Sequence, residues 1–363
     1  MTTSIMRTNN SDEQLIVICE ANSDVGFGHF FRCLHLADSL RNSYGINAYW
    51  VGNITPSLAG LLHERNQQHI FTSNFDNAIT EAQSLNAHAV LCDSYQLAES
   101  HIQQLRHKFK VCIVDDFGTS ALAYADTVIN FTVSAPRYNY AAKQQLLGPR
   151  FFLCDEALNR VRKRRLNQTE FNVDKINLLI AIGGHDRLSM GPYIADLFLL
   201  DNKYAVTLLG PYSSVKSNKK LLHFNRSNDM PSLYKKADLV VSGGGLIKYE
   251  SAYCGIPNIV VAQTPEQFSE TIEFEAVNLC HAVGHHATKM CDLGTNPSSI
   301  SDKEDKHDAF SWSTQELLDT ADKALRERKQ LVKASKIHFE DDATARAAEV
   351  IYNEHFARES AGE

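Results

Sequence analysis

Residues 15–34 read LIVICEANSDVGFGHFFRCL, an apolar run that leads through a glycine turn into a helix pattern. The run 15–19 is typical of a buried strand, and the apolar residues after Gly28 recur at three- and four-residue spacing, as on one helix face. Such a turn aims backbone N–H groups and the positive end of a helix dipole at a ligand. The stretch predicts a site for a phosphorylated substrate, with His29 as a proton-transfer residue. Taken alone, the glycines fit a tight turn at a helix start equally well.

Other apolar, β-branched runs recur along the chain, with helical stretches between them. They are residues 47–51, 87–92, 111–114 and 127–131 in the first half, and 176–182, 205–209, 238–242 and 259–262 in the second. Strands that alternate with helices predict parallel sheets with helices on both faces and ligands at the carboxyl ends of strands. Because 363 residues exceed one ordinary core, we expect two α/β domains.

Shifts in composition set the expected boundaries between these domains. The expected parts are a disordered tail (1–13), an N-terminal domain (14–154), a polar linker (155–174), a second domain (175–335) with a polar insertion (284–310), and a C-terminal helix (336–363). The insertion contains His285, His286 and Cys291, whose spacing matches no standard zinc pattern. No metal site is therefore expected there.

The charge of the chain limits its partners. A formal net charge of -7 argues against nucleic acid, because phosphate neutralisation needs a basic face, but it allows a nucleotide-sized anion. The basic run 160–165 could bind anionic membranes or nucleic acid, yet a solvated helix or linker face suits an acidic chain better. No apolar run approaches the roughly 20 residues of a membrane span, and the N-terminus lacks the apolar region of a secretory signal. Eight cysteines without a CxxC pair suit a reducing cytoplasm.

Polar side chains follow two further strands of the first domain. Asp93, Ser94 and Tyr95 come directly after the run 89–92, where a carboxylate and a phenol could bind sugar hydroxyls or orient a base. Helix capping by Asp93 or Ser94 is the alternative. The pair Asp115-Asp116 follows the next strand and could hold Mg²⁺ or contact substrate, although capping and solvation explain it nearly as well.

Two glycine turns follow strands of the second domain. Gly183-Gly184 and Asp186 come after the run 176–182, and this turn suits a diphosphate. The three glycines 243–245 come after the run 238–242 and would cradle a phosphate. A loose loop is the alternative for them.

Glu250 and Gln267 complete the expected nucleotide site. Glu250 lies one to two turns into the helix after the three glycines, where a carboxylate can take both ribose hydroxyls of a nucleotide. A surface salt bridge is the alternative for this residue. Gln267 lies in the loop after the run 259–262 and could hydrogen-bond phosphate or ribose, or face solvent.

Taken in order, these motifs resemble a known family. They are G-x-G-H-x-x-R-C-L-x-L-A at 26–37, D-S-Y at 93–95, G-G-x-D at 183–186, and the glycine-rich turn with its glutamate and a following G-x-P. The set resembles the hydrolases of UDP-2,4-diacetamido-2,4,6-trideoxy-β-L-altropyranose in pseudaminic acid biosynthesis, a group that includes spore-coat polysaccharide proteins. More distantly it resembles the glycosyltransferase that adds N-acetylglucosamine to lipid I. The resemblance covers residues 15–283.

The resemblance implies the GT-B fold, in which two doubly wound Rossmann-like domains face each other across a cleft. The UDP-sugar substrate would place UDP on the C-terminal domain and the sugar on the N-terminal one. His29 would be the general base that deprotonates the attacking water, since a neutral imidazole can do so at cytoplasmic pH. The implied binding residues are Gly26, Gly28, Arg32, Asp93 and Tyr95 for the substrate, and Gly183, Gly184, Asp186, Gly243, Gly244, Gly245, Glu250 and Gln267 for the nucleotide. No metal or other cofactor is required, because helix N-termini can stabilise the departing diphosphate.

Three departures from the family pattern keep other functions open. Glu266-Gln267 stands where the family usually has Asn-Gln, Phe27 replaces a small residue, and the turn 243–246 is closer to that of transferases. One alternative is a glycosyltransferase of surface polysaccharide or flagellin, with His29 deprotonating an acceptor hydroxyl. Another is a non-catalytic protein that binds nucleotide sugars.

Overall fold

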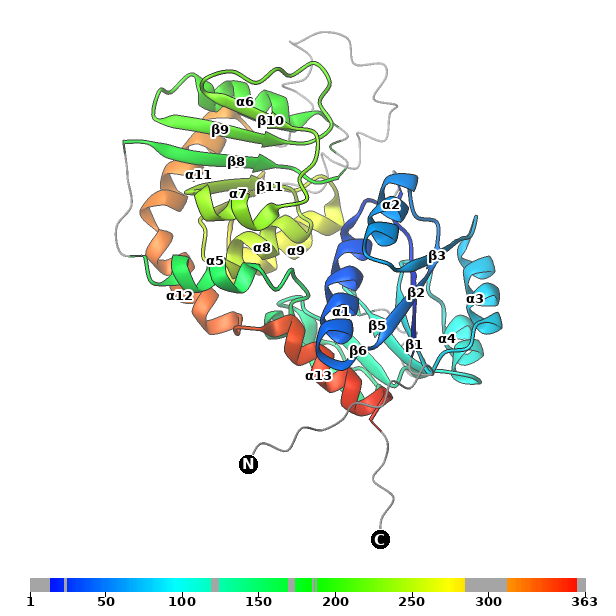
Figure 1. The fold of residues 1–363 in the computed structure, drawn as a ribbon. Coiled ribbons are helices and arrows are strands. Elements are labelled where there is room, and N and C mark those ends of the chain that lie inside the picture. Colours follow the sequence, from blue (N-terminus) through cyan, green and yellow to red (C-terminus); the bar gives the residue numbers. More distant parts are fainter. Residues whose placement is uncertain are drawn as a thin grey trace, which may run out of the picture. The chain divides into compact units, whose positions relative to one another are not determined.

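The computed structural model describes residues 14–22, 25–118, 124–168, 174–184, 186, 188–284 and 312–357. These residues form two compact units (Figure 1). Unit 1 takes the described residues up to 131, residues 135–153, and those from 343 onward, and unit 2 takes residues 132–134 and 154–342. The expected tail (1–13) and residues 285–310 of the expected insertion lie outside the described residues.

Unit 1 is built on a seven-stranded parallel sheet with the order β3-β2-β1-β4-β5-β6-β7. The strands are β1 (Gln14–Cys19), β2 (Asn47–Gly52), β3 (Gln68–Phe71), β4 (Ala89–Asp93), β5 (Lys110–Val114), β6 (Thr127–Asn130) and β7 (Gln144–Leu147). The α-helices of this unit are α1 (Gly28–Tyr44), α2 (Pro56–Glu64), α3 (Phe75–Ser84), α4 (Glu99–Arg106) and α13 (Ala343–His355).

Both faces of the unit 1 sheet are covered by helices (Figure 1). Ile16 and Ile18 of β1 share a buried cluster with side chains of α3 and α4. Leu15, on the other face, lies beside Leu40 of α1 and Ile351 of α13. A strand that is buried on both faces is apolar throughout, and this explains the unbroken run 15–19.

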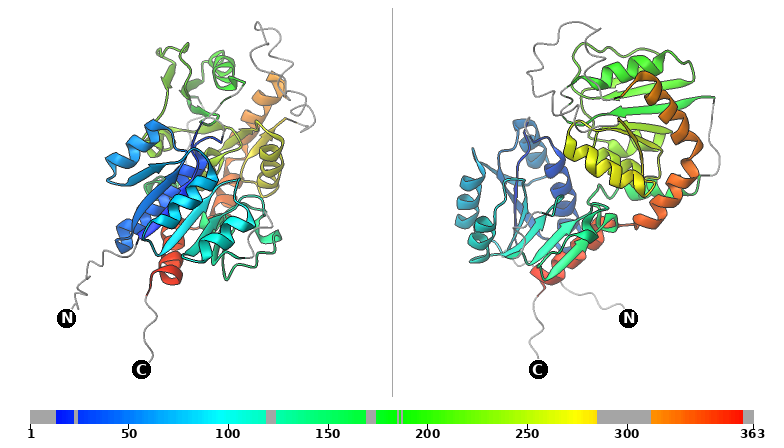
Figure 2. Two further views of the ribbon diagram at one scale, coloured as in Figure 1. Left: turned by 90° about the vertical axis from the view of Figure 1, so that its right-hand side faces the viewer. Right: turned by 180° about the vertical axis from the view of Figure 1, so that it is seen from behind.

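Unit 2 contains a six-stranded parallel sheet with the order β10-β9-β8-β11-β12-β13. The strands are β8 (Ile176–Ala181), β9 (Tyr204–Leu209), β10 (Leu221–Phe224), β11 (Leu239–Ser242), β12 (Asn258–Val261) and β13 (His281–Val283). The α-helices are α5 (Leu158–Leu166), α6 (Met190–Leu199), α7 (Met230–Lys236), α8 (Leu246–Tyr253), α9 (Pro265–Ala276), α11 (Thr314–Arg326) and α12 (Arg328–His338). Helix α11, coloured orange, lies along this sheet (Figure 2) and buries Leu317 and Ala321 against it.

Each sheet reverses its winding direction at one point. In unit 1 the chain moves from β1 outward to β2 and β3, then returns to β4 on the other side of β1. In unit 2 the same reversal lies between β8 and β11. In open parallel sheets, ligands bind beside such a reversal at the carboxyl ends of the strands, because the loops on its two sides diverge and leave a crevice. The fold therefore marks one edge of each unit as a candidate site.

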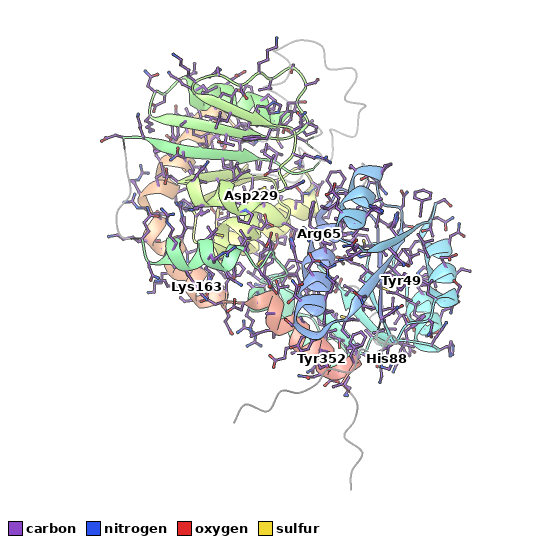
Figure 3. All side chains as sticks on the ribbon, viewed as in Figure 1. Tyr49, Arg65, His88, Lys163, Asp229 and Tyr352 are labelled. Atoms are coloured by element: carbon purple, nitrogen blue, oxygen red, sulfur yellow. The ribbon has the colours of Figure 1, made fainter. Side chains whose placement is uncertain are left out.

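The predicted α/β class with two doubly wound sheets is confirmed. The segment 155–174, expected to be a linker, contains helix α5, which belongs to unit 2. The prediction of a solvated face for its basic run is wrong for two arginines. Arg162 and Arg165 are buried because they donate to main-chain carbonyls, Arg162 to Tyr253 and Phe339, and Arg165 to Ala237. By contrast, Lys163 lies on the exposed side of α5 (Figure 3).

Within the part of the chain that the structure describes, no helix combines the length and the apolar character needed to cross a membrane.

Candidate functional site

The winding reversal of unit 1 brings the first glycine turn and the D-S-Y motif together. Cys19 and Asp93 are paired neighbours at the ends of β1 and β4, so the loops that follow these strands start side by side. In the loop after β1, Gly26 has φ +79°, a left-handed conformation that glycine adopts without strain. Helix α1 begins at Gly28, which places His29 in its first turn, next to Asp93.

His29 lies just beneath the surface of this edge. Its side chain is 5% exposed, and the edge of its ring packs against the ring of Tyr95, whose centroid is 4.5 Å away and which is itself 60% exposed. The Nδ1 atom is buried without a hydrogen bond and lies 3.9 Å from Oδ1 of Asp93. Burial lowers the pKa of His29, and this effect outweighs the opposing charge of Asp93. The imidazole is therefore neutral at pH 7 and able to accept a proton.

Arg32 is held between two carboxylates. Its Nε and Nη2 donate to Asp93 at 2.5 and 2.6 Å, and its Nη1 donates to both oxygens of Asp116 at 2.8 Å. Burial alone would raise the pKa of Asp93, but the charge and hydrogen bonds of Arg32 outweigh it and lower that pKa. Asp93 is therefore ionised at neutral pH. The sequence predicts that Arg32 binds substrate. In the structure its guanidinium is instead bonded to Asp93 and Asp116.

Other polar residues complete this edge, and the motifs indicated them weakly or not at all. Glu20 directly follows β1, is 6% exposed, and accepts hydrogen bonds from Ser94 and Gln96 at 2.9 Å. The signal that could have found it is a carboxylate at the end of an apolar strand. Asp115 accepts a hydrogen bond from Tyr140 at 2.7 Å.

Asp115 and Asp116 lie at this edge of the described ranges, and both accept hydrogen bonds from other side chains. No group of three or more histidine, cysteine, aspartate or glutamate side chains in those ranges is arranged to hold a metal ion. His285, His286 and Cys291 lie outside the described residues. Both oxygens of Asp116 accept hydrogen bonds from Arg32, and this pairing counts against the Mg²⁺ alternative for Asp115 and Asp116.

The winding reversal of unit 2 brings its two glycine turns together. Ala181 at the end of β8 pairs with Ser242 at the end of β11. A Cβ atom on Gly243 would lie 2.0 Å from the carbonyl oxygen of Ile182, and one on Gly244 would lie 2.5 Å from Cβ of Gln267. Side chains at these two positions would force apart the loop after β8, the loop after β11 and the start of α9. Close packing of two loops and the start of α9 is thus the reason for glycine here.

Asp186 organises the start of helix α6. Its Oδ1 accepts from the main-chain N–H of Met190 at 2.9 Å, and its Oδ2 accepts from that of Gly191 and from the Tyr212 hydroxyl, each at 2.7 Å. A carboxylate at a helix N-terminus satisfies N–H groups that the helix itself leaves unpaired. These contacts tie Asp186 to the first turn of α6 and to Tyr212.

Glu250 lies inside unit 2, so the surface salt bridge considered as its alternative is wrong. The residue is 8% exposed and accepts a hydrogen bond from the Tyr234 hydroxyl at 2.6 Å. Burial raises the pKa of Glu250 to about 7, although the hydrogen bond from Tyr234 acts in the opposite direction. Its neighbour Lys248 is fully buried and pairs with Glu270 of α9. Tyr234 and Lys248 carried no recognisable motif in the sequence.

Gln267 lies at the first turn of α9. Its Oε1 accepts from the main-chain N–H of Gln263 at 3.0 Å, and its own N–H donates to the Thr264 hydroxyl that caps the helix. The side chain therefore fixes the loop after β12 against Gly244. Gly183, Gly184 and Gly245 are also predicted to bind the nucleotide. They lie in the loops that follow β8 and β11, at the same edge of the unit 2 sheet.

Comparison with known proteins gives two relatives in sequence, while no known family model matches the chain. An uncharacterised protein of Methanocaldococcus jannaschii is 24% identical over 277 residues, which cover 70% of this chain but 56% of that protein. The chain thus spans about half the length of this relative. The spore coat polysaccharide biosynthesis protein SpsG of Bacillus subtilis is 21% identical over 271 residues, which cover 69% of this chain and 78% of SpsG.

Solved structures resemble the chain over nearly its whole length. MurG of Acinetobacter baumannii has a TM-score of 0.61 at 14% identity, covering 94% of this chain and 99% of that one. MnaA of S. aureus, solved with UDP, has a TM-score of 0.59 at 13% identity, covering 97% and 100%. The glycosyltransferase SnogD from Streptomyces nogalater has a TM-score of 0.56 at 12% identity, covering 95% and 99%. The chain therefore has the GT-B fold of glycosyltransferases, with two Rossmann-like α/β units.

Proposed function

We propose that this protein is an enzyme of polysaccharide biosynthesis that acts on a nucleotide sugar, and that it hydrolyses a UDP-sugar to UDP and free sugar. The observation that carries the proposal is the buried imidazole of His29, whose Nδ1 lies 3.9 Å from Oδ1 of Asp93, at the winding reversal of unit 1. The likeness to SpsG and to the UDP complex of MnaA supports a nucleotide-sugar substrate.

In this proposal the nucleotide binds to unit 2. The loops with Gly183-Gly184 and the glycines 243–245 meet at one sheet edge and offer main-chain N–H groups to a diphosphate. Glu250, four residues into α8, accepts hydrogen bonds from the ribose hydroxyls. Asp186 and Gln267 act indirectly, because their side chains are engaged with the start of α6 and with the loop after β12.

The sugar binds to unit 1, where His29 acts as general base. The Nε2 atom takes a proton from water, whose oxygen attacks the anomeric carbon as the bond to the diphosphate oxygen breaks and its electron pair leaves with UDP. Asp93, 3.9 Å from Nδ1, stabilises the imidazolium that forms. Catalytic hydrogen bonds are often long without substrate, and this distance suits one that tightens when substrate binds. Gly26, Gly28 and Tyr95 border the sugar, and Arg32 keeps Asp93 in place.

The sugar we propose is the diacetamido-trideoxyhexose of nonulosonic acid biosynthesis, which the resemblance implies. The test incubates the protein with UDP-2,4-diacetamido-2,4,6-trideoxy-β-L-altropyranose and measures UDP and reducing sugar together. Equal release of both supports hydrolysis. No release from this substrate or from a panel of other nucleotide sugars contradicts the proposal.

The second candidate is a glycosyltransferase that uses the same base on an acceptor hydroxyl. The fold shared with SnogD and the transferase-like turn 243–246 favour it. The two candidates differ in what UDP release requires. Release that depends on an added acceptor, without free reducing sugar, supports transfer, and release in buffer alone supports hydrolysis.

A further inference from the structure

A buried array of charges lies beside His29. Arg32 joins Asp93 and Asp116, and the exposed fractions of the three side chains are 4%, 1% and 15%. Two hydrogen bonds link Arg32 to Asp93, and two more link it to Asp116. The Tyr95 hydroxyl, 3.4 Å from Asp116, also donates to that carboxylate, while the Tyr95 ring packs against His29.

The groups that act on His29 come from every element around it. Three carboxylates favour the protonated imidazole: Glu20 after β1, Asp93 at the end of β4, and Asp116 after β5. Arg32 is the cation that opposes them, one turn along α1. Tyr95 contributes a neutral ring and hydroxyl. The protonation of His29 therefore depends, besides burial, on how well the guanidinium of Arg32 offsets these negative charges.

The shape of the Arg32 guanidinium suits it to offset the charges of two carboxylates. A guanidinium donates in a rigid fork that matches a carboxylate, so it can hold Asp93 with two nitrogens and still reach Asp116 with the third. A carboxylate 3.9 Å from an imidazole, without such a partner, typically raises the histidine pKa by about one pH unit or more. A larger share of the imidazole would then be protonated near neutral pH, and a smaller share could act as a base.

We propose that Arg32 is a positioning residue that acts together with burial to keep His29 neutral, by holding Asp93 and Asp116 in one salt-bridged array that offsets their charge at the imidazole. This inference deepens the proposed function, in which His29 is the base. Arg32 would therefore touch neither the sugar nor the diphosphate. It acts through the electrostatic environment of the base.

The test follows the protonation of His29 by NMR in the full chain without substrate, with the resonance assigned by its absence from His29→Ala. Arg32→Gln should move the midpoint of the His29 titration upward by about one pH unit, because Asp93 loses its counter-charge. Asp116→Asn should move the midpoint of the His29 titration downward, because one carboxylate fewer then balances the positive charge of Arg32. Arg32→Lys keeps the charge without the fork and should leave the midpoint nearer to wild type than Arg32→Gln does.

Arg41→Gln is the matched control, since Arg41 lies near the other end of the same helix and forms a half-buried pair with Asp38. It should leave the midpoint unchanged. Opposite shifts in Arg32→Gln and Asp116→Asn support the inference, since loss of packing alone does not depend on the sign of the charge removed. No shift, or shifts in one direction, overturns it. If Arg32→Gln does not fold, Asp116→Asn decides alone, with a downward shift in favour and any other result against.

The titration needs no substrate, so it stands apart from the proposed function. Opposite shifts in a protein that releases UDP from no nucleotide sugar would leave the role of Arg32 intact and refute the hydrolase. Hydrolysis that depends on His29, without those shifts, would refute only the role of Arg32. In an active enzyme, the acid limb of the kcat/KM profile should move in the same directions as the NMR midpoint.

Discussion

Gly243 lies so close to Ile182 that a Cβ atom on the glycine would be 2.0 Å from the Ile182 carbonyl oxygen. The two residues belong to the loops that follow β11 and β8, on the two sides of the winding reversal in unit 2. This contact sets the spacing of the two glycine turns. It therefore links the local sequence to the shape of the proposed diphosphate site.

Gly243→Ala should weaken UDP binding by about tenfold or more, because the added methyl group pushes the two turns apart and misdirects their N–H groups. Isothermal titration calorimetry measures this. Gly60→Ala is the matched control, because Gly60 lies in α2 with open space around it. It should leave UDP affinity unchanged and stabilise the helix slightly. Equal affinities for both variants would contradict the proposed diphosphate site.

UDP binding should strengthen as pH rises from 6 to 8. The pKa of Glu250 is raised to about 7, so the carboxylate forms in this range, and an ionised acceptor makes the stronger hydrogen bonds to ribose hydroxyls. Glu250→Gln should bind UDP with an affinity that lacks this rise. The measurement is calorimetry across the pH range in buffers matched for ionisation heat. A rise that persists in the variant would assign the effect to another group.

Asp186→Ala should lower the free energy of unfolding by about 2 kcal/mol, because three donors in unit 2 lose their acceptor. Tyr212→Phe should cost about 1 kcal/mol, since it removes one of these hydrogen bonds. Urea denaturation measures both. Asp196→Ala changes an exposed residue of α6, the helix whose first N–H groups Asp186 accepts, and should stay within about 0.5 kcal/mol of wild type. A change in Asp186→Ala as small as that in the control would refute the structural role of Asp186.

Stability should fall in mild acid through His355 of α13. This residue is 2% exposed, and its Nε2 bonds to the Thr127 hydroxyl at 2.7 Å. Burial lowers the pKa of His355 to about 4, below the usual 6.5, so the unfolded chain binds a proton that the folded chain does not between these values. The contribution of His355 is therefore complete above pH 6.5 and is lost as pH falls toward 4.

Between pH 7 and 5 this loss should amount to about 2 kcal/mol. Urea denaturation at the two values measures it. His355→Gln should lose less stability than wild type over the same range, because glutamine does not titrate. A pH dependence identical in the two proteins would show that other groups cause it.

The inner strands of both sheets could be predicted from the sequence, and the strands at their edges could not. Each of the nine predicted apolar runs overlaps a strand, and the ends of run and strand differ by at most two residues. The strands without a prediction are β3, β7, β10 and β13, which are the four sheet edges. An edge strand pairs on one side only and carries polar or exposed residues, such as Gln68, Gln144 and His223. Its sequence therefore contains no continuous apolar run from which a strand could be predicted.

The candidate site was predictable where a motif follows a strand. The glycine turns and the D-S-Y motif lie at the two winding reversals, as ligand sites in such sheets require. The sequence could not show which polar groups pair with one another. Arg32 is separated in sequence from Asp93 by 61 positions and from Asp116 by 84 positions. Glu250 and Tyr234 likewise meet only inside the folded unit 2. Such contacts depend on tertiary packing, which local spacing does not encode.

The central claim is that His29 removes the proton from the attacking water, and one paired measurement tests it most directly. His29→Ala is compared with wild type for UDP release from UDP-2,4-diacetamido-2,4,6-trideoxy-β-L-altropyranose and for UDP binding by calorimetry. We expect turnover to fall by about 100-fold or more while UDP affinity stays the same, because the base acts only in the chemical step. Turnover by His29→Ala equal to that of wild type would contradict the account.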